Sequence, residues 1–291
     1  MDSTVFKILT IDGGGVKGLY SATILNKFED YFGKRCTDCF DLICGTSTGG
    51  LIAMALSLKI PASHVVGIYE NRSAEIFPAK SKLRRLFRQI IWRGIHTDKG
   101  LIRVLDDLFG DRTLSESNNL LCIPSFSFTE YRPVVFRRDH SDLFRHNQLK
   151  YKDVALATSA APTYLPMAEL SEYDHKQMID GGVWANNPAL VGLAEALRYF
   201  VGEGKPYDQI QLLSIPSLNA RKGNPLGMRR ERSFLDWKGD IIRLVAVRIM
   251  KMSRFRAKSK YGGFCISQER ARMEGYDGHG QAALPDLVVT F

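Results

Sequence analysis

A serine flanked by glycines stands between two apolar segments near the start of the chain. Residues 45–49 read Gly-Thr-Ser-Thr-Gly, which fits the G-x-S-x-G pattern of a nucleophile elbow with Ser47 at its centre. An apolar strand-like run, residues 40–44, precedes this turn, and an apolar helix-forming run follows it. Gly45 and Gly49 leave room for the sharp bend that presents the serine hydroxyl to a carbonyl. Taken alone, the pattern also fits a Ser/Thr-rich helix cap.

Three consecutive glycines, Gly13, Gly14 and Gly15, follow the first apolar strand-like segment. Their amides are not shielded by side chains, so they can form a nest that stabilises an oxyanion or binds a phosphate. Together with Gly18 they also satisfy G-x-G-x-x-G, the pattern of a dinucleotide-binding turn. That alternative needs an acidic residue at the far end of the second strand, whereas Asp41 stands at its beginning.

A nucleophilic serine requires a group that accepts its proton. None of the six histidines stands in a motif typical of a catalytic loop. Asp180 ends a short apolar segment and is followed by Gly181 and Gly182, so its carboxylate can approach another turn closely. Asp-Gly-Gly is by itself typical of a simple turn. Asp180 is nevertheless the best candidate for the base.

The elements that must position these residues alternate between strand and helix. Asn187 followed by Pro188 predicts the start of one helix. Its core-facing stripe would comprise Leu190, Leu193, Ala194 and Leu197. The alternation predicts a three-layer α/β/α fold with a mostly parallel central sheet and the nucleophile elbow between a strand and a helix. We expect strands near residues 5–11, 40–44, 120–123, 134–137, 177–179 and 209–215.

Length and composition predict one domain. The chain has 291 residues, 45% of them hydrophobic, and we expect a core over residues 7–215 with a basic extension, residues 216–291, packed on it. The start shows no signal-peptide pattern, and no apolar run approaches the ~20 residues that span a bilayer. The five cysteines favour a reducing cytoplasm. Cys36 and Cys39 have C-x-x-C spacing but no second pair, so we expect neither a metal nor a cofactor.

Basic residues are concentrated in two tracts of the chain. Residues 80–93 contain six basic residues and no acidic one, and residues 221–274 contain fifteen against five. Such segregation indicates an anionic partner, whether lipid headgroups, a nucleotide or a nucleic acid. No nucleic-acid-binding motif is visible, so we expect no such partner.

The first basic tract has the pattern of an amphipathic helix. It would lie in a membrane interface or pack on the protein with its basic side in water, and the sequence leaves both open. The candidate membrane contacts are Leu83, Arg84, Arg85, Phe87, Arg88 and Trp92.

The three glycine-flanked motifs together resemble the patatin-like phospholipase family. That family carries D-G-G-G-x-[KR]-G, G-x-S-x-G and D-G-[GA] in this order, which correspond here to residues 12–18, 45–49 and 180–182. The flanking residues 40–43 and 157–164 match as well. After the last predicted strand, the sequence Pro-Ser-Leu replaces the family's usual glycine-rich continuation.

The resemblance implies a serine acyl hydrolase that cleaves membrane phospholipid esters with a dyad of Ser47 and Asp180. The amides of residues 13–15 would form the oxyanion hole, and Lys17 would lie beside it. A further similarity, over residues 19–25 and 55–61, to bacterial patatin-like effectors of antiphage defence implies a cyclic dinucleotide activator such as cyclic GMP-AMP. It also implies action from the cytoplasm on the inner membrane surface. A patatin-like lipase or esterase without nucleotide control is the alternative, and a homo-oligomer is compatible with both.

Overall fold

The central sheet has seven strands, and β3 has three partners in it. The computed structural model describes residues 4–76 and 98–218. The strand order is β5-β6-β3-β2-β1-β7, and β4 also pairs with β3. The strands are β1 (Val5–Ile11), β2 (Leu42–Gly45), β3 (Leu120–Ser127), β4 (Arg132–Arg137), β5 (Ala168–Leu170), β6 (Lys176–Asp180) and β7 (Gln209–Ile215).

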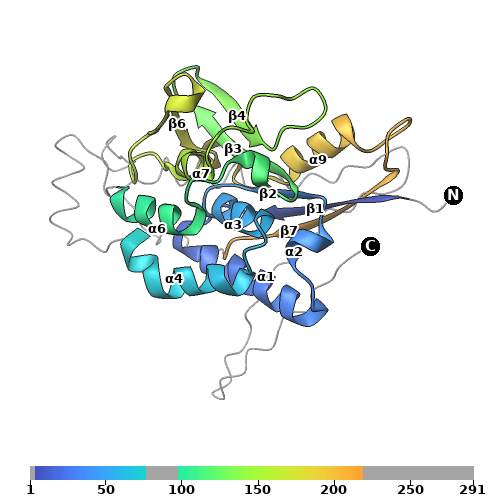
Figure 1. Ribbon diagram of the computed structural model, residues 1–291, viewed down its shortest axis with the longest axis horizontal. Coiled ribbons are helices and arrows are strands. Elements are labelled where there is room, and N and C mark those ends of the chain that lie inside the picture. Colours follow the sequence, from blue (N-terminus) through green and yellow to red (C-terminus); the bar gives the residue numbers. More distant parts are fainter. Residues whose placement is uncertain (1–3, 77–97, 219–291) are drawn as a thin grey trace, which may run out of the picture. The chain divides into compact units, whose positions relative to one another are not determined.

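Helices cover both faces of this sheet (Figure 1). The α/β fold expected from the alternating pattern is thereby confirmed. The longer helices are α1 (Gly18–Phe32), α3 (Thr48–Ser57), α4 (Ala62–Ile76), α6 (Lys99–Phe109), α7 (Tyr151–Ser159) and α9 (Ala189–Tyr199). Single turns complete the described part: α2 (Cys36–Cys39), α8 (Gly182–Ala185), η1 (Gly15–Lys17), η2 (Leu114–Glu116) and η3 (Ser171–Tyr173).

The parallel part of the sheet consists of β7, β1, β2 and β3. The pairs β3 with β4, β3 with β6 and β5 with β6 are antiparallel, so the sheet is mixed and not mostly parallel as the sequence predicted. Because parallel strands end on the same side, the segments that follow β1, β2, β3 and β7 emerge at one edge of the sheet. We call this edge the carboxyl edge, and it is where ligands bind in open α/β sheets.

One side of β3 is shared by two strands that meet end to end. Leu120 to Cys122 pair with β2, and Ser125 to Ser127 pair with β6, while β4 occupies the other side over residues 122–127. Since β2 and β6 run in opposite directions, their carboxyl ends face each other across Pro124. A proline, which has no N–H to donate, suits the position at which β3 changes partner.

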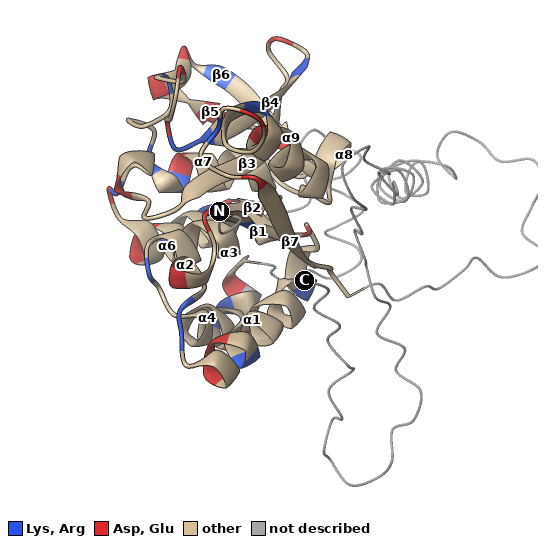
Figure 2. Cartoon of the chain, turned by 90° about the vertical axis from the view of Figure 1, so that its right-hand side faces the viewer, with Lys and Arg blue, Asp and Glu red and all other residues tan. Residues whose placement is uncertain are grey.

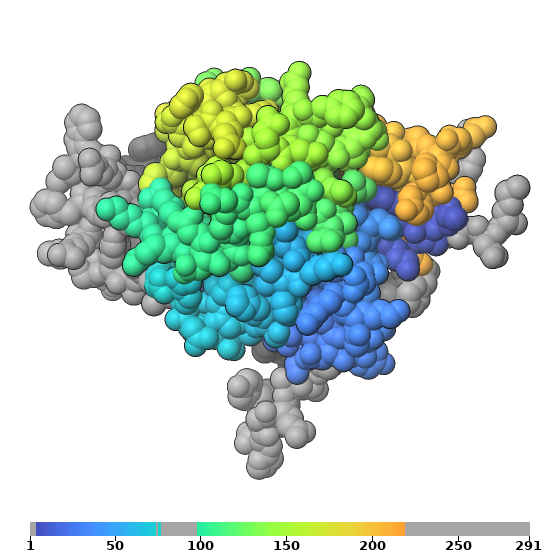
Figure 3. Space-filling model, viewed as in Figure 1, coloured from blue at the N-terminus to red at the C-terminus, as the bar shows by residue number. Residues whose placement is uncertain are grey.

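The two faces of the sheet bury different layers. Leu9 and Ile43 belong to the larger core with α1, α3, α4, α6 and α7, whereas Ile8 and Leu42 belong to a smaller core with α9. This alternation follows the two-residue period of a strand. The two layers lie on opposite sides of the sheet in Figure 2, and in Figure 3 the segments of α1, α4 and α6, coloured from blue through cyan to green, lie side by side on one face.

The orientation of α9 differs from the sequence prediction. The predicted core-facing stripe includes Leu190 and Leu197, yet these side chains are 42% and 47% exposed. The buried face carries Ala189, Gly192, Glu195 and Ala196 instead. A Cβ on Gly192 would approach the Cys44 Sγ to 2.8 Å, so small residues allow α9 to lie close to the sheet. The Asn187 side chain accepts the Ala189 amide at 2.9 Å, but Pro188 takes the N-cap position and α9 begins one residue later than predicted, at Ala189.

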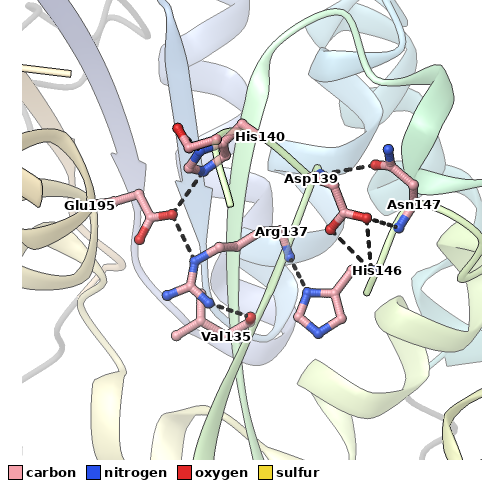
Figure 4. A network of polar contacts seen from close by, with 8 residues as sticks. Val135, Arg137, Asp139, His140, His146, Asn147 and Glu195 are labelled. Atoms are coloured by element: carbon pink, nitrogen blue, oxygen red, sulfur yellow. Dashed lines mark hydrogen bonds and ion pairs between the residues drawn. The ribbon is translucent and has the colours of Figure 1, made fainter. Parts of the chain in front are cut away.

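A buried ion pair fastens α9 to the neighbouring strand (Figure 4). The Glu195 carboxylate lies 2.8 Å from the Arg137 guanidinium and 2.9 Å from the His140 ring. Burial acts to raise the pKa of Glu195, but the hydrogen bond from His140 and the charge of Arg137 outweigh it, so the pKa is lowered. Close by, Asp139 accepts the backbone amides of His146 and Asn147 and so fixes the segment after β4.

Candidate active site

Ser47 occupies a strained turn between β2 and α3. Its backbone has φ 56° and ψ −126°, a conformation that L residues other than glycine rarely adopt. A Cβ on Gly45 would lie 2.1 Å from the Gly49 carbonyl oxygen, and one on Gly49 would lie 2.3 Å from the Ile11 carbonyl oxygen. Only glycine fits at these two positions, because backbone atoms fill the space. The turn has the geometry of a nucleophile elbow, not of a simple helix cap.

The Ser47 hydroxyl donates a hydrogen bond to the Asp180 carboxylate at 2.7 Å, between Oγ and Oδ2. The other carboxylate oxygen accepts the Gly182 amide at 2.6 Å. Burial raises the pKa of Asp180 to about 6, although the hydrogen bonds from Gly182 and Ser47 act in the opposite direction. A carboxylate with such a pKa is ionised at neutral pH and is a stronger base than an exposed aspartate.

Thr158, at the end of α7, connects the three segments that meet here. Its hydroxyl accepts the Ser47 amide at 3.0 Å and donates to the Pro124 carbonyl at 2.6 Å. Its own carbonyl accepts the Gly181 amide at 3.2 Å. The side chain of Thr158 therefore holds the elbow and the point where β3 changes partner, and its backbone carbonyl holds the turn after Asp180.

The glycine turn after β1 lies against the same site, but Gly13 does not offer a free amide. Its N–H donates to the Asn186 carbonyl at 2.9 Å, and the Asn186 side chain donates back to the Gly13 carbonyl at 3.2 Å. The prediction that all of residues 13–15 can donate to an oxyanion is therefore wrong at Gly13. This amide is used to hold the turn against the segment after α8.

The other two glycines are differently placed. The Gly14 amide donates to the Thr48 hydroxyl over 3.2 Å, a long contact at the start of α3. Gly15 donates no hydrogen bond to any residue of the described ranges, and its φ of 60° is in the left-handed region. Lys17 is exposed beside this turn, and the buried Gly18 begins α1.

Asp12, at the end of β1, is buried beneath this turn. Burial raises its pKa to about 7, against hydrogen bonds from the Ser217 backbone and the Asn187 side chain. One of its carboxylate oxygens has no hydrogen-bond partner among the described residues.

The acidic residue that a dinucleotide-binding turn would require is absent from the carboxyl edge after β2. Asp41 instead accepts the Lys7 amide at 2.7 Å, at the opposite end of the strand.

Sequence reasoning assigned no role to Thr158 or Asn186, although both make contacts that hold this site. Thr158 lies in residues 157–164, which match the family pattern, and Asn186 follows the Asp-Gly-Gly turn after three further residues. Neither residue type has catalytic chemistry of its own, so only their proximity to the motifs could have singled them out.

Several predicted features lie outside the described ranges. These are the candidate membrane contacts in residues 83–92 and almost all of the extension predicted for 216–291. Within the described ranges, no group of three or more His, Cys, Asp or Glu side chains is arranged to hold a metal ion. Cys36 and Cys39 are free thiols on α2. No helix in the part of the chain that the structure describes is both long and apolar enough to cross a bilayer.

Comparisons with known proteins agree with the motifs. A cGAMP-activated phospholipase of Pseudomonas aeruginosa (strain BWHPSA011 / Pa011) is 33% identical over 242 residues, which cover 82% of this chain and 71% of the relative. A cGAMP-activated phospholipase of Vibrio cholerae is 34% identical over 209 residues, which cover 66% of this chain and 58% of the relative. Patatin-like protein 3 of Arabidopsis thaliana is 31% identical, and the match covers 72% of this chain and 57% of the relative.

The chain thus spans less than two thirds of the length of the latter two relatives. Among solved structures, VipD from Legionella pneumophila aligns with 10% identity and a TM-score of 0.39, over 85% of this chain and 67% of that one. The family described as patatin-like phospholipase matches residues 9–193, which is more than half of the chain and includes all three motifs. The chain therefore belongs to the patatin-like phospholipase family, a family of ester hydrolases.

Proposed function

We propose that this protein is a serine acyl hydrolase that cleaves the acyl esters of membrane phospholipids. The observation that carries the proposal is the 2.7 Å hydrogen bond from the Ser47 hydroxyl to the buried carboxylate of Asp180. A hydroxyl on a strained elbow, paired with a carboxylate whose pKa burial raises to about 6, is an activated nucleophile. Family membership supports the choice of an ester as the substrate.

In the first half of the reaction, the Ser47 Oγ attacks the ester carbonyl carbon while its proton passes to Asp180. The carbonyl oxygen becomes an oxyanion in the tetrahedral intermediate. When this intermediate collapses, the bond to the alcohol oxygen breaks and the alcohol takes the proton from Asp180. The products are a lysophospholipid and an acyl group esterified to Ser47.

In the second half, water attacks the acyl carbon and gives its proton to Asp180. Collapse of the second tetrahedral intermediate returns this proton to the Ser47 oxygen and releases the fatty acid. The carboxylate thus acts twice as a base and twice as an acid, and no third residue is needed to carry the proton.

The oxyanion is held by the amides of Gly14 and Gly15. The Gly15 amide has no hydrogen-bond partner in the described part of the chain. The hydrogen bond from the Gly14 amide to Thr48 is long and therefore weak, so this amide can donate to a charged acceptor instead. The start of α3, directly after Ser47, adds the positive end of a helix dipole. Removal of one such donor typically costs a factor of about 10² to 10³ in kcat.

In this proposal, a cyclic dinucleotide such as cyclic GMP-AMP activates the hydrolysis. Three relatives that are 30–34% identical carry the name cGAMP-activated phospholipase. The protein would then act in bacterial antiphage defence, from the cytoplasm on the surface of the inner membrane. A constitutive lipase or esterase without nucleotide control is the alternative, since the names of the plant patatin-like relatives mention no activator.

The test is release of fatty acid from phospholipid vesicles, measured with and without cyclic GMP-AMP. Ser47→Ala should lower the rate by a factor on the order of 10⁶, while Ser171→Ala, an exposed serine in η3, should leave it unchanged. Hydrolysis that requires the nucleotide supports the effector function, and equal rates without it support the constitutive alternative. A Ser47→Ala protein that retains the activity would overturn the proposal.

A further inference from the structure

Exposed apolar side chains of the described residues gather at the carboxyl edge of the sheet. Eleven large apolar side chains in these ranges are exposed, and six of them lie on segments that surround Ser47. These six, which we call the rim, come from four separate segments. They are Val16, Phe128, Tyr131, Tyr164, Met167 and Leu218, with exposed fractions between 42% and 78%.

Strand pairing places these segments around the catalytic groups. Val16 follows β1 and Leu218 follows β7, both at the carboxyl edge. Phe128 and Tyr131 form the turn between β3 and β4, just beyond Ser125, which pairs with Asp180.

The fourth segment approaches from the other side of β6. Met167 directly precedes Ala168, the residue of β5 that pairs with Met178, two residues before Asp180. Tyr164 lies three residues earlier in the same connection. Both side chains therefore belong to the surroundings of the dyad.

The turn between β3 and β4 also projects past the active site. Ser125 is level with Asp180, and the turn begins three residues later, so at about 3.3 Å per residue its tip stands on the order of 10 Å beyond the carboxylate. The Tyr131 ring packs edge-on against Phe126, with 5.7 Å between ring centroids, which holds the turn in this position.

From this arrangement we infer that the rim is the surface by which the protein enters a phospholipid membrane, an inference that rests on the proposed function. Side chains that bind interfacially reach roughly 5–10 Å into the boundary between headgroups and acyl chains. A tip that projects by a similar distance brings Ser47 to the depth of the ester bonds. Tyrosine suits this position because its ring is apolar and its hydroxyl is polar.

A bilayer fits the rim better than a folded protein partner does. The six side chains protrude from four separate segments, whereas a stable protein interface needs a continuous complementary surface of about 800 Å² on each partner. Lys17 is exposed among them and can contact a headgroup phosphate.

The chain offers a matched control at the opposite edge. Tyr31 is 84% exposed and Phe32 is 50% exposed at the end of α1, which runs from Gly18 beside the site for 15 residues, or about 22 Å. Loss of these two aromatic side chains removes a similar exposed apolar area, but at a distance from the catalytic groups.

The experiment compares Phe128→Ser/Tyr131→Asn with Tyr31→Ser/Phe32→Ser in the full chain. Asparagine is chosen at position 131 because the native φ is 55°. Binding is measured by flotation with vesicles of phosphatidylethanolamine and phosphatidylglycerol. The rate at which the same vesicles are hydrolysed is divided by the rate at which dissolved 4-nitrophenyl butyrate is hydrolysed, and this gives a ratio of the two rates.

We expect the rim variant to lose at least tenfold in vesicle binding and in this ratio, and the control variant to change by less than twofold. Tyr164→Ser/Met167→Ser, on a different segment, should reproduce the loss, which excludes a local folding defect of the turn. Equal behaviour of the rim and control variants would overturn the inference. If neither substrate is hydrolysed by the unaltered protein, the proposed function fails, while the flotation result still decides whether the rim binds membranes.

Discussion

The backbone amide of Ser47 donates to the hydroxyl of Thr158, 3.0 Å away, so the elbow is held by a side chain 111 residues further along the chain. The same hydroxyl donates to Pro124, where β2 and β6 meet along β3. The distance between Ser47 and Asp180 thus depends on α7 as well as on the sheet. Thr158 positions the dyad without itself contacting the reacting atoms.

Thr158→Val should lower kcat by about 10- to 100-fold, because it removes both hydrogen bonds while keeping the side-chain volume. It should also lower the free energy of unfolding by about 1–3 kcal/mol, since the Ser47 amide and the Pro124 carbonyl lose their partner. Thr158→Ser keeps the hydroxyl and should retain most of kcat. Measured kcat and urea unfolding check both effects, and a valine variant with normal kcat would show that Thr158 has no positioning role.

The pH dependence of the reaction should reflect Asp180. Since burial raises its pKa to about 6, the carboxylate accepts a proton from Ser47 only above that pH. We expect kcat/KM for a dissolved ester to rise about tenfold per pH unit below 6 and to level off above 7. A profile that stays flat down to pH 5 would show that another group is the base.

Asp12 should make the fold less stable as the pH rises. Its pKa in the folded protein is raised from 3.8 to about 7, so the stability it contributes is fully present below pH 4 and is lost as the pH rises through 7. Asp12→Asn removes the charge and should make the protein more stable than the native chain at pH 8, with little difference at pH 4. Urea unfolding at the two pH values tests this, and an identical pH dependence of the variant would contradict it.

Glu195→Ala should lower the free energy of unfolding by about 3 kcal/mol, because it leaves the largely buried Arg137 without its counter-charge. Glu169→Ala is the matched control. Glu169 also pairs with a histidine, His175, but both side chains are more than half exposed, so the loss should stay below about 1 kcal/mol. Thermal unfolding of the two variants tests the difference. Similar losses of stability would show that the buried Glu195–Arg137 pair stabilises the fold no more than the exposed Glu169–His175 pair does.

The fold was predictable where the residues of a segment themselves indicate its secondary structure. The periodicity of residues 5–11 and 209–215 predicted β1 and β7 with their observed bounds, since both segments are rich in β-branched and apolar residues. The three-residue strand β5 is too short for its residues to indicate a strand, and it is extended because it pairs with β6. In α9 the leucines suggested the wrong face, because the close approach of the helix to the sheet selects small residues for contact.

The candidate site was likewise predictable only in part. The turns that carry Ser47 and Asp180 were predictable because the glycines beside these two residues are visible in the sequence. Gly13 was predicted to have a free amide, but the carbonyl that occupies it belongs to Asn186, 173 residues away, and no local pattern reveals that contact. The contacts of Thr158 depend in the same way on the partner change of β3, which follows from the whole sheet.

The most direct test of the dyad is reaction of the protein with a serine-directed fluorophosphonate, with the modified residue identified by peptide mass spectrometry. Attack by an activated serine should attach the label to Ser47 in the native protein, and Asp180→Asn should slow the labelling by about 10² or more, because the amide cannot accept the proton. Label on another residue, or equally fast labelling of Ser47 in the Asp180→Asn variant, would contradict the account.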